Sequence, residues 1–180
     1  MAPIIEFSHI VSIEPWPADG IVVDLNASDV ERGSLLERFQ LIELRSLCAK
    51  GKIVRVGGML HLSGEIEAEA VQSCVVTLNP VVSIVRTPFE RRYQSGDRQA
   101  GAEKEGVPAI GVDQPISEDT VDIEMLDRDE IDVGAVVAEE FYLALDPYPR
   151  DAGADEVMAE RQRRERDDVS DSPFAELRRH

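Results

Sequence analysis

Residues 58–93 decide the fold: GMLHLSGEIEAEAVQSCVVTLNPVVSIVRTPFERRY. In the first half of this stretch, apolar or small side chains occupy every second position, at Leu60, Leu62, Gly64, Ile66, Ala68 and Ala70. Polar residues, mostly glutamates, fill the positions between them. A period of two predicts a β-strand with one face in a core and the other in water, which is typical of antiparallel sheets. The small residues on the apolar face predict close approach of a helix or a second sheet.

The second half of the stretch predicts a strand that returns beside the first. After a bend near Thr77–Pro80, residues 81–93 form another extended run. Pro88 places the middle of this run at a sheet edge or a bulge, because proline cannot donate to a ladder of hydrogen bonds. The two runs therefore predict a long hairpin over about residues 59–93.

Shorter elements precede the hairpin. Segments rich in β-branched and aromatic side chains predict three strands, over residues 4–13, 20–25 and 52–56. Ser28 and Glu31 form a capping-box pattern, and apolar residues follow at helical spacing, at Leu35, Phe39 and Ile42. We expect this helix to end around residues 40–44.

A second helix is predicted near the end of the globular part. Asp132 is a suitable N-cap, and apolar residues recur along one face, at Val133, Val136, Val137, Phe141 and Ala144. Pro147 and Pro149 end this helix, and residues 121–126 predict a short strand before it. The fold class is therefore α+β, with a mainly antiparallel sheet built around the hairpin and two packed helices.

The remaining segments are polar and lack periodicity. Residues 94–120 are rich in Gly, Pro and acids and predict a mobile acidic loop. Residues 151–171 predict disorder or a frayed helix over 158–166, and Ser172 with Pro173 predicts a short terminal helix. We expect two parts, a single α+β domain over residues 1–150 and a charged, largely disordered tail over 151–180.

The charge of the chain is concentrated in its second half. The net charge is −17; residues 1–96 hold 12 acidic and 9 basic side chains, whereas residues 97–180 hold 24 and 10. An acidic surface repels phosphate backbones and suits a basic partner, such as a ribosomal protein or a ribosome-assembly factor. Acidic linkers and tails also serve solubility alone, so composition leaves both interpretations open.

Other features predict a cytoplasmic protein. The chain has no apolar run of 18 residues, and its N-terminal stretch lacks the basic region of a secretory signal. Its two cysteines, Cys48 and Cys74, are too few for a disulfide framework.

The cysteine in the bend is the obvious place to look for chemistry. Cys74 is followed three residues later by Thr77 rather than by a second cysteine. A structural zinc site needs about four Cys or His ligands, and a redox pair needs a resolving thiol. No G-x-S-x-G, H-E-x-x-H or P-loop pattern occurs. We therefore predict no catalytic residue, cofactor or metal, and interpret Cys74 as a small buried side chain.

A basic and aromatic cluster lies on the second hairpin strand, at Arg86, Arg91, Arg92 and Tyr93. Such a cluster can contact RNA through phosphates and base stacking. It can equally form salt bridges across the hairpin with glutamates of the first strand, at Glu65, Glu67 and Glu69.

Three motifs together resemble the YceD family, the large ribosomal RNA subunit accumulation proteins. Residues 58–85 resemble the family's hairpin, including Cys74, Leu78 and Pro80. The segment from Asp129 to Pro149 is similar to the family's second motif, including Asp132, Glu139 and Glu140. The ending Ser172–Leu177, with Phe174, resembles the family's C-terminal motif. The chain departs from the pattern at Thr77, because many members carry Cys-x-x-Cys there, and some add cysteines after the second motif.

The resemblance implies a cytoplasmic bacterial protein that supports the synthesis, processing or stability of 23S ribosomal RNA, without catalysis of its own. We hypothesise that it is an acidic adaptor for a basic ribosomal protein or assembly factor. The alternative is direct binding of ribosomal RNA through Arg86, Arg91, Arg92 and Tyr93. No small-molecule substrate and no membrane partner are expected.

Overall fold

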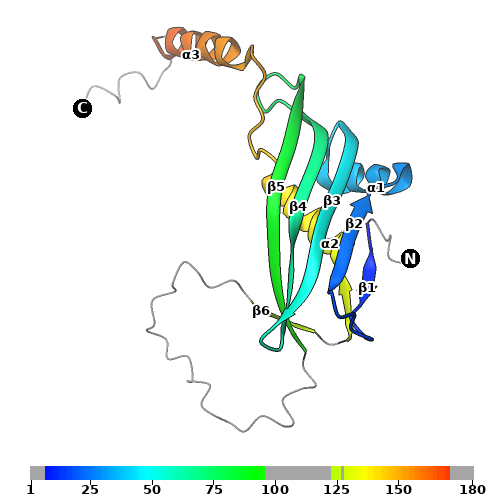
Figure 1. The fold of residues 1–180 in the computed structure, drawn as a ribbon. Coiled ribbons are helices and arrows are strands. Elements are labelled where there is room, and N and C mark those ends of the chain that lie inside the picture. The colour runs from blue at the N-terminus through cyan, green and yellow to red at the C-terminus, as the bar shows by residue number, and fades with distance from the viewer. Residues whose placement is uncertain (1–6, 96–122, 127, 171–180) are drawn as a thin grey trace, which may run out of the picture.

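The computed structural model describes residues 7–95, 123–126 and 128–170 and contains a five-stranded sheet (Figure 1). Its strands follow the order β2, β3, β4, β5 and β6, with bounds Ile21–Asn26, Glu43–Val56, Met59–Ser73, Pro80–Ser95 and Ile123–Leu126. The first four strands pair in antiparallel fashion, and the short β6 pairs in parallel with the end of β5. The predicted α+β class is confirmed.

The long hairpin is formed by β4 and β5. Its ladder runs from Leu60 opposite Tyr93 to Ser73 opposite Pro80, so the hairpin predicted over about residues 59–93 is present. The alternating apolar residues of β4 are buried, whereas the glutamates between them face outward. β6 pairs only with Arg92–Ser95, so within the described chain Pro88 lies on the open edge of β5.

The small size of Gly64 in β4 has a local explanation. Gly64 lies opposite Gly51 of β3 and Phe89 of β5. A Cβ atom on Gly64 would lie 2.3 Å from the carbonyl oxygen of Lys50 and 2.8 Å from the Phe89 ring. The neighbouring strand and the aromatic ring therefore occupy this space, and no second sheet is needed to explain it.

Helix α1, Asp29–Phe39, begins with the predicted capping box. The Ser28 N–H donates to the Glu31 carboxylate at 2.8 Å, and the Glu31 N–H donates to the Ser28 hydroxyl at 3.4 Å. The helix ends at Phe39 because Gln40 adopts a left-handed conformation, with φ of 54°. Ile42 was therefore wrongly placed on the helix: it lies beyond the end, and its N–H donates to the Val71 carbonyl.

Strand β3 consequently begins at Glu43, earlier than the predicted strand over residues 52–56. It turns into β4 through Gly57 and Gly58, whose φ angles of 59° and 85° suit glycine.

Helix α2, Val133–Ala144, crosses the inner face of the sheet (Figure 1). The predicted apolar stripe is confirmed, since Val133, Val137 and Phe141 are fully buried. Full burial of such a side chain contributes about 1.5–3 kcal/mol. The main core lies between this helix, α1 and the buried side chains of β2–β5.

A small two-stranded sheet leads into α2. Strand β1, Ile10–Ser12, pairs with β7, Glu130–Asp132, in antiparallel fashion. The N–H of Val133 then donates to the His9 carbonyl at 3.0 Å. A Cβ on Gly134 would lie 2.6 Å from the His9 nitrogen, so a glycine is required where the two segments cross.

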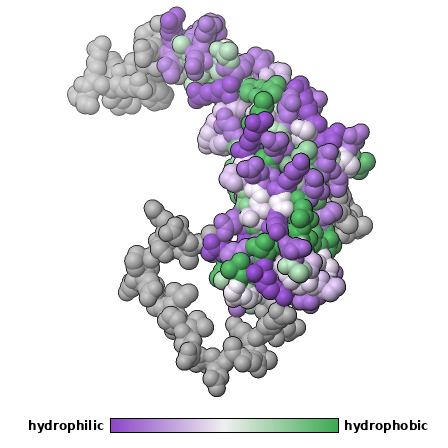
Figure 2. Space-filling model, in the orientation of Figure 1, coloured by the Kyte–Doolittle hydropathy of each residue, from purple (hydrophilic) through white to green (hydrophobic). Residues whose placement is uncertain are grey.

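Helix α3, Ala154–Ser170, follows α2 and extends away from the sheet (Figure 1). From the sequence, this region was predicted to be disordered or to form a frayed helix over residues 158–166. The observed helix is longer than that at both ends. Its visible surface is largely hydrophilic (Figure 2). The predicted acidic loop lies mostly, and the predicted terminal helix entirely, outside the described residues. Within the described ranges, no helix is long and apolar enough to cross a membrane.

Candidate functional site at the hairpin bend

The bend between β4 and β5 is a tight, internally bonded loop. The N–H of Cys74 donates to the Asn79 carbonyl at 2.8 Å, and the N–H of Leu78 donates to the Cys74 carbonyl at 3.0 Å. Leu78 adopts a left-handed φ of 64° and leaves 76% of its surface exposed. Pro80 starts β5 opposite Ser73. Cys74 and Pro80 thus shape the bend, while Leu78 points apolar surface to solvent.

The sulfur of Cys74 is the centre of this loop. Cys74 is fully buried, as predicted, and its Sγ accepts from the N–H groups of Val76 and Thr77 at 3.4 Å each and of Asp151 at 3.5 Å. Burial acts to raise the pKa of this thiol, but the hydrogen bonds from Thr77, Asp151 and Val76 outweigh it and hold the pKa below its ordinary value. Cys74 is thus both a small buried side chain and an acceptor of three backbone hydrogen bonds.

Asp151, in the segment after α2, completes the loop. Its Oδ2 accepts from the Thr77 hydroxyl at 2.8 Å and from the Asn79 side-chain amide at 2.6 Å, and its Oδ1 lies 3.7 Å from the Cys74 sulfur. The bonds from Asn79 and Thr77 lower the pKa of the Asp151 carboxyl, because they favour its charged form. We call Cys74, Thr77, Asn79 and Asp151 the hairpin clasp.

The clasp joins two segments that are distant in sequence. A backbone bond from Val75 N–H to the Pro149 carbonyl, at 3.0 Å, adds to it. Asp151 was missed from the sequence because no local pattern links it to Cys74. Among residues 7–95, 123–126 and 128–170, no cluster of three or more His, Cys, Asp or Glu side chains could hold a metal ion.

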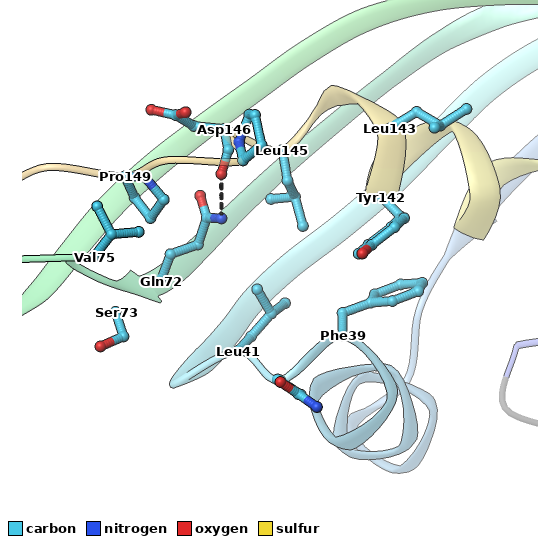
Figure 3. A pocket seen from close by; sticks show the side chains of 12 residues that line it. Phe39, Leu41, Gln72, Ser73, Val75, Tyr142, Leu143, Leu145, Asp146 and Pro149 are labelled. Atoms are coloured by element: carbon cyan, nitrogen blue, oxygen red, sulfur yellow. Dashed lines mark hydrogen bonds between the residues drawn. The ribbon is translucent and has the colours of Figure 1, made fainter. Parts of the chain in front are cut away.

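An apolar groove of about 420 Å³ opens beside the clasp, between the end of α1, the bend and the end of α2 (Figure 3). Phe39 stacks on Tyr142 with ring centroids 4.9 Å apart, and the Gln72 side chain donates to the Asp146 carbonyl at 2.8 Å. Tyr142 and Leu143 remain 54% and 72% exposed. The groove is lined by Phe39, Gln40, Leu41, Gln72, Ser73, Val75, Tyr142, Leu143, Leu145, Asp146, Pro147 and Pro149.

The groove combines an apolar wall with a single charged lining residue, Asp146. Most of the wall comes from the Leu-Ala-Leu-Asp-Pro-Tyr-Pro run over residues 143–149 and from the hairpin end. From the sequence, this run was predicted to end a helix and to close the second motif, and no groove was expected there. Its exposed apolar side chains, rather than its prolines alone, give the surface a capacity to bind another chain.

Asp132 has a clear structural role at the start of α2. As N-cap, its carboxylate accepts from the Ala135 N–H at 3.1 Å, and it also accepts from the Ser8 hydroxyl at 2.6 Å and the His9 N–H at 2.9 Å. One side chain therefore caps the helix and holds the N-terminal segment against it.

Glu139 and Glu140 both hold Arg91. The guanidinium lies 3.3 Å from the Glu139 carboxylate and 2.8 Å from that of Glu140, and it also pairs with Glu124 of β6 at 3.0 Å. Burial opposes the charge of Arg91, but these carboxylates outweigh it and raise its pKa. The two motif glutamates therefore hold α2 against the hairpin through Arg91, and Glu124 holds β6 through the same guanidinium.

The basic cluster that the sequence suggested does not form one RNA-binding face. Tyr93 is only 3% exposed, and burial raises its pKa to about 12. Arg91 points inward to α2, whereas Arg86 and Arg92 lie on the other face of β5 and pair with Glu67 at 3.4 Å and Glu90 at 3.1 Å. The salt-bridge interpretation fits Arg86, whereas Tyr93, the residue that would stack on a base in the RNA alternative, is buried. Phe174 lies outside the described residues.

The geometry thus defines an α+β protein in which the residues of two motifs build the hydrogen-bonded hairpin bend, hold α2 against the sheet and line an apolar groove. The family model described as large ribosomal RNA subunit accumulation protein YceD matches residues 62–179, about two thirds of the 180-residue chain. The chain belongs to the YceD family, as the motifs had indicated. No curated protein and no solved structure gives a significant match.

Proposed function

We propose that this protein promotes the accumulation of 23S ribosomal RNA as a non-catalytic, acidic adaptor that binds a basic ribosomal protein or assembly factor in the cytoplasm. Membership of a family named for accumulation of large-subunit RNA supports the link to ribosomes. The adaptor role rests on one observation, the separation of charge along the chain: residues 97–180 carry 24 acidic and 10 basic side chains.

The arrangement of the basic residues favours a protein partner over direct RNA contact. The three hairpin arginines, Arg86, Arg91 and Arg92, are each paired with glutamate. RNA phosphates would have to displace these glutamates and approach a chain of net charge −17. A basic protein would instead be attracted, because acidic side chains of the second half are exposed, such as Asp129, Glu130 and Glu156.

The test compares two triple variants with equal changes in charge. One carries Asp129→Asn, Glu130→Gln and Glu156→Gln; the other carries Asp24→Asn, Glu37→Gln and Glu65→Gln, exposed positions in the first half. Each is used to capture proteins from a bacterial lysate at low salt, followed by mass spectrometry. We expect the wild type and the first-half variant to retain ribosomal proteins or assembly factors, and the second-half variant to lose them.

Equal recovery with both variants would contradict the electrostatic adaptor. Filter binding to 23S RNA fragments over a salt series tests the RNA alternative, since phosphate contacts give an affinity that falls steeply with salt. Tight, salt-sensitive binding by the purified protein would replace the adaptor with direct RNA recognition. A deletion strain complemented by each variant then links binding to the level of 23S RNA.

A further inference from the structure

We propose that the apolar groove beside the hairpin clasp binds residues 172–177 of a second copy of this chain. This inference is independent of the adaptor function and concerns self-association. It starts from the groove itself, whose Tyr142, Leu143 and Val75 leave 54%, 72% and 49% of their surfaces exposed. At about 420 Å³, the groove has room for an aromatic side chain and its neighbours.

The chemistry of residues 171–180 matches the groove. The stretch reads Asp-Ser-Pro-Phe-Ala-Glu-Leu-Arg-Arg-His, and it offers Pro173, Phe174 and Leu177 after a strongly charged helix. The stacked rings of Phe39 and Tyr142 form an aromatic wall suited to Phe174. Arg178 and Arg179 follow Leu177 directly and complement Asp146, the single charged lining residue.

Charge also favours this stretch over the rest of the second half. Residues 171–180 contain two acidic and two basic side chains, so they carry no net charge in a chain of −17. Two copies repel one another overall, but the docking segment itself is not repelled. Apolar contacts at the groove can therefore hold the copies together at physiological salt, where charges farther apart than about 8 Å are largely screened.

The length of α3 favours binding of residues 172–177 to another copy over binding to their own groove. The helix starts at Ala154, five residues after the groove residue Pro149, and its 17 residues extend for about 25 Å. Figure 1 shows it leading away from the sheet. Phe174 is four positions beyond its end, Ser170, so at most about 14 Å of chain joins the two residues. Because this reach is shorter than the helix, we assign the segment to the groove of a second copy, and two copies can exchange their segments reciprocally.

The first test measures oligomeric state by sedimentation equilibrium at high protein concentration. We expect the wild type to form a dimer, and both Phe174→Ala and Leu143→Glu to raise the dimer dissociation constant at least about tenfold, as for loss of a central anchor. Val22→Glu is the matched control, because Val22 is 76% exposed on β2 and is not among the residues that line the groove. It should dimerise like the wild type. Circular dichroism checks that every variant is folded.

The second test uses a labelled peptide of residues 171–180 and the full chain carrying Phe174→Ala. Fluorescence anisotropy should show saturable binding, which is lost when Leu143→Glu is added or when the peptide itself carries Phe174→Ala. A monomeric wild type, or a peptide that binds equally to the Leu143→Glu chain, would overturn the proposal. A cross-linker placed at position 174 that joins the groove within a single monomeric chain would also overturn the proposal, because the occupant would then be the segment of the same copy.

Discussion

The hydroxyl of Thr77 donates a 2.8 Å hydrogen bond to the carboxylate of Asp151, 74 residues further along the chain. This bond joins the hairpin bend to the segment after α2, and the Cys74 sulfur and the Asn79 amide bond to the same carboxylate. In this chain a threonine and an aspartate close the bend by hydrogen bonding, so its order does not depend on a thiol pair.

Replacing Thr77 with valine should lower the free energy of unfolding by about 1 kcal/mol, because the change keeps the shape of the side chain and leaves Asp151 with one donor fewer. Urea denaturation followed by circular dichroism measures the change. Thr87→Val is the matched control: Thr87 lies on β5 and its hydroxyl donates to the adjacent Pro88 carbonyl. An equal loss in both variants would mean that the clasp adds nothing specific.

The two cysteines should differ strongly in reactivity. Cys74 is fully buried, whereas Cys48 is partly exposed. We expect one thiol to react quickly with an aromatic disulfide reagent and the other only as the bend opens, and Cys48→Ala should remove the fast phase. In that background, Thr77→Val should accelerate the slow phase, since it weakens the clasp that covers Cys74. An unchanged slow rate would show that opening of the bend does not depend on Thr77.

Stability should fall at acid pH partly through Asp151. Bonds from Asn79 and Thr77 lower the pKa of this carboxyl in the folded state. Its stabilising effect is therefore present above its unfolded pKa, about 3.9, and is lost as pH falls through the lower folded value. Asp151→Asn should flatten the dependence of the urea midpoint on pH below about 4. The exposed Asp155→Asn serves as control, and an identical flattening there would contradict the assignment.

Arg91 should contribute more to stability than Arg86. Arg91 is largely covered and contacts three glutamates, whereas Arg86 forms one exposed pair with Glu67. Arg91→Met should cost about 1–2 kcal/mol, because it removes charged hydrogen bonds and leaves the glutamates facing one another. Arg86→Met should cost less than about 0.5 kcal/mol. Thermal unfolding measures both, and equal costs would exclude a special role for the motif glutamates.

The local patterns in the sequence predicted the parts of the fold that depend on local physics. The period of two in β4 and the capping box at Ser28 each follow from neighbouring residues, and both are present. The end of α1 was misplaced because Ile42 fits a helical stripe, while the left-handed turn at Gln40 has no strong residue signal.

The site was less predictable, because it depends on contacts across the fold. Nothing near Cys74 in sequence points to Asp151. The placement of the basic cluster, by contrast, could have been predicted from the sequence, because its residues alternate between the two faces of β5. Alternation along β5 puts Arg91 and Tyr93 on the face of the buried Phe89, and puts Arg86 on the opposite one. The prediction grouped these residues by their basic and aromatic character and did not use their spacing along the strand.

Two glycines should respond in opposite ways to alanine. Gly33 lies inside α1, and a Cβ there meets no atom within 4 Å, so Gly33→Ala should stabilise the protein by about 0.5–1 kcal/mol through helix propensity alone. At Gly134 a Cβ would lie 2.6 Å from the His9 nitrogen and 2.9 Å from the Phe7 carbonyl oxygen. These are backbone atoms, which cannot rotate away, so Gly134→Ala should cost about 1–3 kcal/mol or detach the N-terminal segment from α2. Urea denaturation gives both free energies, and amide hydrogen exchange at Val133, whose N–H bonds to His9, reports detachment. Stabilisation by both changes would show that the N-terminal segment does not pack against α2 in solution.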